Sequence, residues 1–293
     1  MGFKGVCQEK SSVSKIGILF LLFIFSLILH TIIALALIIL FFDSGILAIQ
    51  HPDLTNQSSV DALKLMQLFN GLGLFITPML FYSYLTGFDF KFANITRQET
   101  LLVISIMMLI TPFVSLLLEW NMQIPFPDWI LYFTSHSETI VEAFLKMSTI
   151  TDLLYTLIVI AIVPAIGEEL LFRGYLQKKI ARKLRNPQIA ILITAFLFSL
   201  IHLDLQAFIP RMFLGSLLGY LYYWSKNLWI PILAHFVNNA QVVIFSHPLF
   251  KVDSSVYSIF SEEKINPMMG LFSFAAAMLL VYLLYQNLSI KKG

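Results

Sequence analysis

Two adjacent glutamates within a long apolar segment are the most unusual chemical feature of this sequence. They occur in Gly167-Glu-Glu-Leu-Leu-Phe-Arg173, and ionisable groups inside such segments are costly and usually functional. Neighbouring residues on a helix point about 100° apart, so Glu168 and Glu169 cannot share one face. Glu169 precedes Arg173 by four residues, which is the favourable order for an ion pair. We therefore expect Glu169 to pair with Arg173, and Glu168 to face a cavity as a general base.

Two histidines and an asparagine lie on later apolar segments. His202 ends the sequence Phe198-Ser-Leu-Ile-His202. His235 and Asn239 are four residues apart and so face one side of a helix. Peptide hydrolysis needs a base or a metal ion that activates water, and a donor that stabilises the oxyanion. One carboxylate, two imidazoles and an amide on three different segments match that requirement.

Each of these groups also has a purely structural interpretation. The two glutamates would suit a charge cluster that ends a helix, and the histidines and Asn239 would suit hydrogen bonds between membrane helices. The sequence contains neither His-Glu-x-x-His nor Gly-x-Ser-x-Gly, and Cys7 is its single cysteine. These motifs would have marked a zincin or a serine hydrolase, so both classes are excluded by motif. The occurrence of all the groups together favours a hydrolytic site.

The composition places these residues in a membrane protein. Hydrophobic residues make up 58% of the 293 residues and charged residues 12%, with a mean hydropathy of +0.81. A soluble domain carries about 25% charged residues, so lipid must be the solvent for much of this chain. The net charge of +2, without a dense basic patch interleaved with aromatic residues, gives no indication of nucleic-acid binding.

The hydropathy pattern predicts an all-α polytopic transmembrane helical bundle with about eight spans of about 20 apolar residues each. The predicted spans cover residues 16–42, 65–86, 100–118, 153–173, 189–205, 208–224, 228–247 and 268–287. The first of them is longer than the apolar core of a signal peptide and lacks an obvious cleavage site, so we expect it to be retained.

The distribution of basic residues predicts the orientation, because cytoplasmic loops are enriched in lysine and arginine. The loop over residues 174–188 contains five basic residues and no acidic one. Lysines also precede the first span and follow the last, whereas residues 119–152 are mostly acidic among their charged positions. With eight spans, the basic segments all fall on the cytoplasmic side and the acidic segment falls outside. We therefore expect a plasma-membrane protein whose two termini are cytoplasmic.

Short interfacial elements are expected between the third and fourth spans. Residues 124–133 contain aromatic side chains that suit a membrane interface, and a second short helix is predicted over residues 138–148. Asp204 and Arg211 flank the turn after His202, where we expect them to form an interfacial ion pair.

Three regions follow from these spans. They are an N-terminal transmembrane region with three spans and the interfacial segment (1–151), a four-span catalytic core (152–247), and a C-terminal span with its tail (248–293).

The order of the three motifs resembles a known family. Glu-Glu-x-x-x-Arg, Phe-x-x-x-His and His-x-x-x-Asn on successive spans, over about residues 152–241, are similar to the CAAX protease and bacteriocin-processing (CPBP) family. That family includes type II CAAX prenyl endopeptidases and lysostaphin-resistance-like (Abi) proteins. The resemblance implies a catalytic set with the following members: Glu168, His202, His235 and Asn239. It assigns supporting positions to Glu169 and Arg173.

Two mechanisms and one other class of protein fit these residues. In one mechanism Glu168 activates water, His202 orients it, and His235 with Asn239 stabilises the oxyanion. In the other, Glu168, His202 and His235 hold Zn²⁺ or another divalent metal ion with one position open for water. The expected partners are a membrane-associated protein or peptide substrate and the lipid bilayer, with no nucleic acid.

The alternative class is a non-proteolytic membrane protein, either a proton-coupled transporter or an immunity scaffold, because buried Glu, His and Asn also form proton relays. A protease gathers the four groups in one cavity, whereas a relay spreads them along a path across the bilayer.

Overall fold

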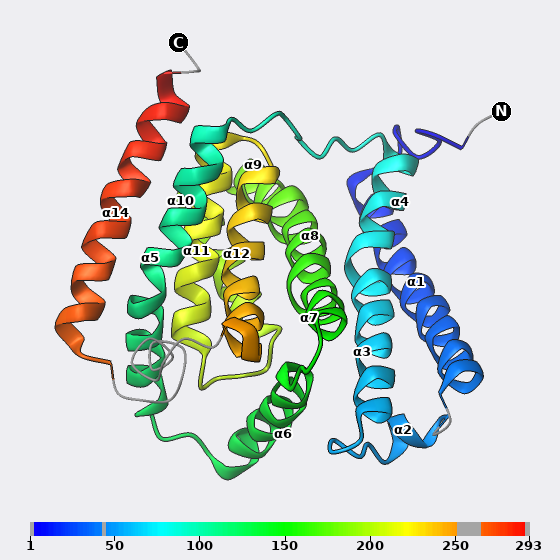
Figure 1. Cartoon of the computed structure of the whole chain (residues 1–293). Coiled ribbons are helices and arrows are strands. Elements are labelled where there is room, and N and C mark those ends of the chain that lie inside the picture. The colour runs from blue at the N-terminus through cyan, green and yellow to red at the C-terminus, as the bar shows by residue number, and fades with distance from the viewer. Residues whose placement is uncertain (1–2, 43–44, 251–264, 291–293) are drawn as a thin grey trace.

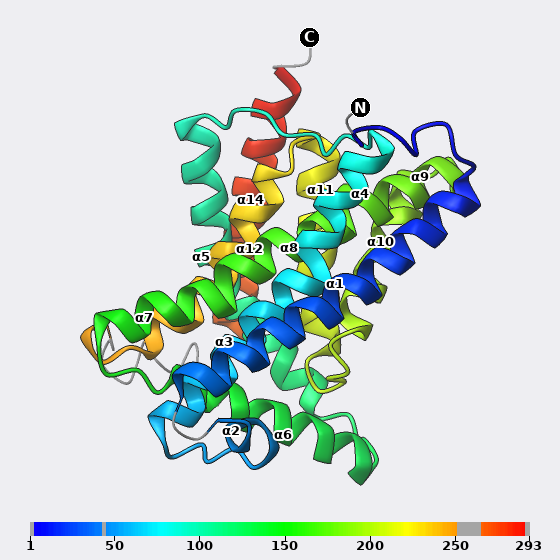
Figure 2. The same ribbon diagram turned by 90° about the vertical axis from the view of Figure 1, so that its right-hand side faces the viewer.

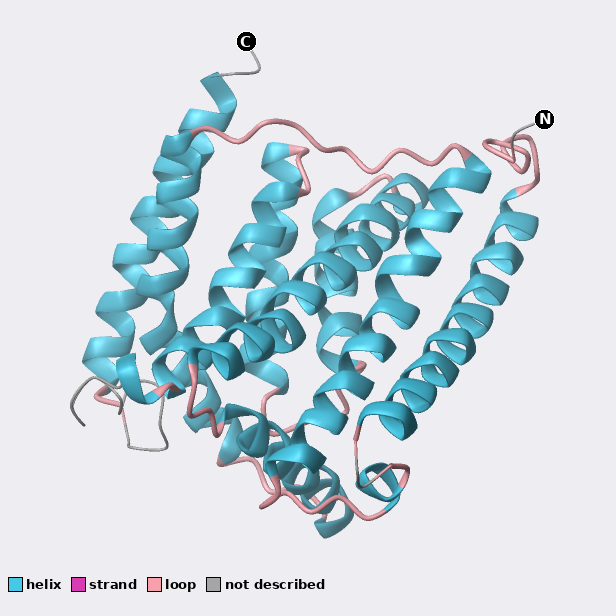
Figure 3. Ribbon diagram, turned by 45° about the vertical axis from the view of Figure 1, so that its right-hand side comes forward, coloured by secondary structure: helices cyan, strands magenta, loops and turns pink. Residues whose placement is uncertain are grey.

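The computed structural model describes residues 3–42, 45–250 and 265–290, and every regular element within these ranges is a helix (Figures 1 and 3). The predicted all-helical class is therefore confirmed. In chain order the helices are α1 (Ser12–Phe41), α2 (Leu47–Gln50), α3 (Gln57–Gly71), η1 (Leu72–Ile76), α4 (Thr77–Thr86), α5 (Arg97–Met122), α6 (Asp128–Leu145), α7 (Ile150–Thr156), η2 (Leu157–Ile162), α8 (Val163–Glu169), η3 (Leu170–Gln177), α9 (Lys178–Leu184), α10 (Pro187–Leu200), α11 (Phe208–Ser225), α12 (Trp229–Ser246), η4 (Pro248–Phe250) and α14 (Pro267–Ile290).

Within the described residues, six helices are long and apolar enough to cross a membrane, which identifies an integral membrane protein. Each of the eight predicted spans contains a helix, although the fifth span (189–205) ends early because α10 stops at Leu200, and two of these helices, α10 and α11, are not among the six. The 14 residues of α10 extend only about 21 Å at 1.5 Å per residue, less than the roughly 30 Å core of a bilayer. The count of eight spans therefore stays a prediction. Part of the third predicted region, residues 251–264, lies outside the described residues.

A single helical rod of 35 residues, from Ile150 to Leu184, crosses the molecule and carries both glutamates. It consists of α7, η2, α8, η3 and α9, in which η2 and η3 are π-helical. The rod lies between α3 and α4 on one side and α12 on the other (Figures 1 and 2). Helices α5 and α14 pack side by side beyond α11 and α12. The π-helical turns of η2 and η3 are wider than α-helical turns, and such turns occur frequently at functional sites.

The interfacial segment differs from its prediction. Two short helices were expected over residues 124–133 and 138–148, but one continuous helix, α6, runs from Asp128 to Leu145. No glycine or proline occurs between those ends, so nothing in the backbone breaks the helix. The polar residues in the middle of α6 led to the prediction of a loop between two helices. They lower the local hydropathy, but the helix continues through them.

Gly167 sets the distance between the rod and η1, immediately before the catalytic candidate Glu168. A methyl group at Gly167 would lie 2.5 Å from Phe75 Cβ, so the two helices would have to separate. We expect Gly167→Ala to lower the free energy of unfolding by about 1–3 kcal/mol, measured by thermal unfolding in detergent. Gly17→Ala is the control, because that methyl group would meet nothing within 4 Å. Equal melting temperatures for the two variants would contradict this packing.

Candidate active site

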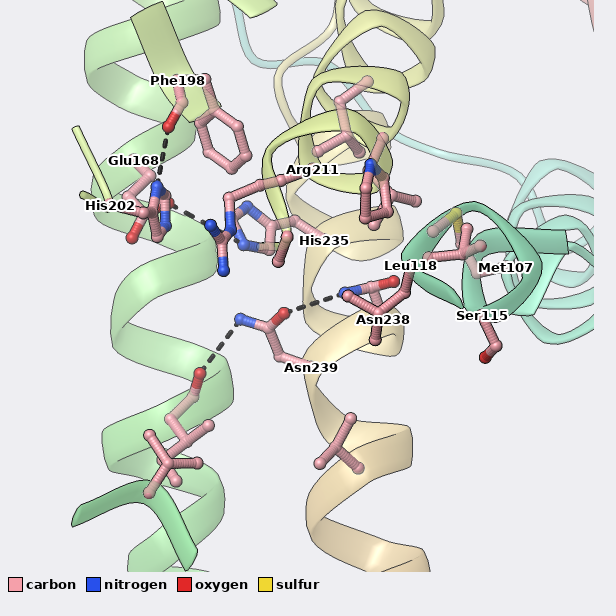
Figure 4. A pocket seen from close by; sticks show the side chains of 18 residues that line it. Met107, Ser115, Leu118, Glu168, Phe198, His202, Arg211, His235, Asn238 and Asn239 are labelled. Atoms are coloured by element: carbon pink, nitrogen blue, oxygen red, sulfur yellow. Dashed lines mark hydrogen bonds and ion pairs between the residues drawn. The ribbon is translucent and has the colours of Figure 1, made fainter. Parts of the chain in front are cut away.

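The four predicted catalytic residues line one pocket (Figure 4). Glu168 lies near the end of α8, His202 in the turn after α10, and His235 and Asn239 on α12. The sequence predicted this convergence, and the geometry confirms it. The pocket extends along α5, α11 and α12 to Val141 of α6.

Glu168 lies at the centre of the cluster. Its side chain is buried, and its Oε2 has no hydrogen-bond partner among the described residues. The Nε2 atoms of His202 and His235 each lie 4.0 Å from this oxygen. Each nitrogen is therefore close enough to share a water molecule with this oxygen.

The other nitrogen of each ring fixes its orientation. Nδ1 of His202 lies 2.7 Å from the carbonyl oxygen of Phe198, which can only accept, so this nitrogen is the donor. Nδ1 of His235 lies 2.9 Å from Oε1 of Glu169, an arrangement that orients ligand and catalytic histidines in many sites. In the neutral tautomer, both Nε2 atoms then direct a lone pair towards Glu168. Three acceptor groups facing one another create a position for a species that carries hydrogens or positive charge.

The turn after α10 positions His202. The backbone N–H of His202 donates to Ser199 rather than Phe198, which leaves the Phe198 carbonyl available to the imidazole ring. Leu203 then adopts a φ of 54°, in the left-handed region that non-glycine residues rarely occupy. Asn121 at the end of α5 holds this turn through two hydrogen bonds, one to the Leu205 carbonyl at 2.7 Å and one from the backbone N–H of residue 209 at 2.8 Å.

The predicted pair of Glu169 and Arg173 is present and buried. Their charged atoms are 2.5 Å apart, and both side chains are essentially inaccessible to solvent. Arg173 also donates to the carbonyl of Gly215 on α11 at 2.8 Å. Because Glu169 accepts from both Arg173 and His235, it links this ion pair to the cluster around Glu168. Sequence reasoning did not find this second link, since Glu169 and His235 are 66 residues apart.

Asn239 lies in the pocket but is bonded away from Glu168. Its Nδ2 donates to the carbonyl of Ile160 in η2 at 3.1 Å, and its Oδ1 accepts from Asn238 at 3.1 Å. One of the two amide hydrogens is used by Ile160, so the second is available to another acceptor. Asn238 also lines the pocket, and its position beside Asn239 was the only sign of it in the sequence.

Arg211 is a further pocket residue that sequence reasoning placed elsewhere. It forms the predicted ion pair with Asp204 at 2.9 Å. It also lines the pocket together with Glu168 and His202, because the turn folds α11 back towards the cluster. The site therefore contains a cation that the motifs do not include.

The spacing of the three metal-ligand candidates is wider than a tetrahedral zinc site requires. Ligand atoms with bonds of about 2.1 Å at tetrahedral angles lie about 3.4 Å apart, whereas Glu168 Oε2 is 4.0 Å from each histidine Nε2. Across the described part of the chain, no three His, Cys, Asp or Glu residues form a group that could hold a metal ion. A water molecule with hydrogen bonds of about 2.8 Å would bridge atoms 4.0 Å apart without any movement.

Comparison with known proteins identifies the segment that contains this cluster. Residues 150–241 match the family model for Rce1-like type II CAAX prenyl endopeptidases. The match confirms the resemblance predicted from the three motifs. All four catalytic candidates, with Glu169 and Arg173, lie inside this Rce1-like segment.

Two curated relatives align with a part of this chain of nearly the same length. The "Putative membrane peptidase YdiL" of Bacillus subtilis (strain 168) is 35% identical over 88 residues, which cover 30% of this chain and 36% of the relative. The "Membrane-embedded CAAX protease MroQ" of Staphylococcus aureus (strain USA300) is 30% identical over 92 residues, which cover 29% and 37% respectively. The chain thus spans little more than a third of the length of these relatives. No solved structure matches it significantly.

Proposed function

We propose that this protein is an intramembrane endopeptidase that hydrolyses a peptide bond of a membrane-associated protein or peptide. One observation carries the proposal: the Nε2 atoms of His202 and His235, from separate parts of the chain, each lie 4.0 Å from the unpartnered Oε2 of Glu168 in one pocket. The Rce1-like segment and the peptidase names of both relatives support the same reaction class.

The mechanism follows from the orientation of these groups. A water molecule at this point would donate one hydrogen to Oε2 of Glu168 and the other to Nε2 of one of the two histidines. Glu168 removes one proton as the water oxygen attacks the carbonyl carbon, and it later delivers that proton to the leaving amine nitrogen. The free amide hydrogen of Asn239 and the guanidinium of Arg211 are donors for the oxyanion. Glu169 holds His235 in place but does not touch the reacting atoms.

Convergence also separates this proposal from a proton relay. A relay requires titratable groups spaced along a route through the membrane, whereas these groups meet at one pocket. The proposed orientation has both termini on the cytoplasmic side of the plasma membrane. Protease access to tags at the two ends of the chain tests this orientation, and tags on opposite sides would refute it.

The function and the role of metal ions can be tested together. Purified protein is dialysed against a chelator, its metal content is measured, and it is incubated with membranes from cells that lack it. New protein N-termini should appear in these membranes. After dialysis has lowered the metal content below about one ion per ten chains, they should appear at the same rate as with undialysed protein. A peptidase that requires zinc would lose its activity and regain it with Zn²⁺, which would support the metal-bound alternative. Absence of new N-termini under both conditions would count against peptidase activity.

A further inference from the structure

An apolar groove runs between α1 and the C-terminal half of the rod. Its walls are residues of α1 and η3: Ile16, Leu19, Phe20, Phe23, Leu171, Tyr175 and Leu176. The side chains of Ile16 and Phe20 are 60% and 63% exposed, so this wall is open to the surroundings. In an integral membrane protein, such a surface faces the hydrocarbon of the bilayer.

One end of the groove is strongly basic. Lys179, Arg182 and Lys183 of α9 form that end. A second pocket adjoins it, shares Lys179 and Arg182, and adds Lys15 and Lys178. The basic residues thus cluster at the position where the apolar walls end.

The carboxylates near this cluster do not neutralise it. Among the described residues, no carboxylate lies within ion-pair distance of Lys179, Arg182 or Lys183. Asp89 lines the second pocket, but it is paired with Lys91 at 2.7 Å, and this contact holds the pKa of Asp89 below its ordinary value. Lys178 is partly engaged, since it donates to the backbone carbonyl of Asp89.

We propose that this groove binds an anionic phospholipid, with an acyl chain along α1 and the phosphate at Lys179, Arg182 and Lys183. The charge complementarity selects the headgroup, and the apolar walls select a ligand with a hydrocarbon chain. Basic pockets between membrane helices are typical sites for such headgroups. The basic end belongs to the loop predicted to be cytoplasmic, the side on which anionic lipids give the membrane a negative surface potential.

The site is tested by binding, independently of peptidase activity. Full-length protein in neutral detergent is titrated with phosphatidylglycerol or phosphatidylcholine, and bound lipid is counted by native mass spectrometry. Phosphatidylglycerol should bind at least tenfold more tightly than phosphatidylcholine. Glycerol 3-phosphate alone should not compete at the same concentrations, because it lacks the chain that the groove accommodates. Equal affinity for the two lipids, or full competition by glycerol 3-phosphate, would overturn the proposal.

Variants locate the site within the molecule. Changing Lys179, Arg182 and Lys183 together to Gln should weaken phosphatidylglycerol binding about 100-fold, since each cation near an anionic surface contributes about a factor of five. The matched control changes three basic residues outside the groove to Gln: Lys10, Arg97 and Lys146. Phe20→Ala, at an exposed position of the wall, should weaken both lipids several-fold. The proposal fails if the control weakens binding as much as the groove variant does.

Discussion

Glu168→Gln is expected to lower the rate of peptide cleavage by at least about a hundredfold, and up to about ten-thousandfold, the range for loss of general acid–base catalysis. The substitution keeps the size of the side chain but removes the group that accepts a proton from water. Oε2 of Glu168 has no partner among the described residues, so the change leaves no opposite charge unpaired. The variant should therefore fold and enter the membrane normally. The measurement is the initial rate of product formation by purified protein, together with its melting temperature.

A second glutamate provides the matched control. Glu142 lies on α6 beside the pocket-lining Val141, and its side chain is exposed. Glu142→Gln removes the same charge close to the pocket without touching the catalytic cluster, so its rate should stay within about twofold of the wild-type rate. If Glu168→Gln cleaves at the wild-type rate, Glu168 is not the base. A folded but inactive Glu169→Gln would then indicate that the two glutamates have exchanged roles.

Glu169→Gln is expected to give the largest loss of stability, about 3–5 kcal/mol, because it leaves the buried charge of Arg173 uncompensated. Arg173→Met should cost a similar amount for the opposite reason. The double variant should recover part of the lost stability, since it removes both charges and leaves no buried charge without its partner. Thermal unfolding in detergent and the yield of folded protein measure these differences.

The structure adds an activity test that separates the two roles of Glu169. Its Oε1 accepts from both Arg173 and Nδ1 of His235. The Glu169→Gln/Arg173→Met variant should therefore regain stability but not the cleavage rate, because His235 still lacks the carboxylate that fixes its ring. Recovery of both stability and rate would show that Glu169 acts only through the ion pair.

Much of the fold and of the site was accessible from the sequence because it depends on local periodicity. The apolar segments predicted helices, and the four-residue spacings predicted both the pairing of Glu169 with Arg173 and the shared face of His235 and Asn239. Three short motifs in order also predicted which segments would meet. The Rce1-like match over residues 150–241 agrees with that prediction.

What the sequence did not predict depends on contacts between distant elements. The bond from His235 to Glu169 requires α8 and α12 to pack in one particular phase, which helical spacing does not determine. Arg211 reaches the pocket only because the chain reverses after His202. The reversal occurs at Leu203, whose φ is in the left-handed region. Asn239 binds a carbonyl of η2, and no pattern indicated that this part of the rod would be π-helical. The sequence predicted two short helices in place of α6, because the polar residues in its middle were interpreted as a loop.

The most direct test of the central claim compares membrane proteins from cells that carry the wild-type protein with those from cells that carry Glu168→Gln. Protein N-termini are quantified in both membrane fractions, after immunodetection has shown equal amounts of the two variants. At least one membrane-associated protein should be cleaved in the wild type and remain intact in the variant. The cleavage should return when the wild-type protein is restored. Identical sets of N-termini in the two cell lines would contradict the assignment of Glu168 as the catalytic base of an intramembrane peptidase.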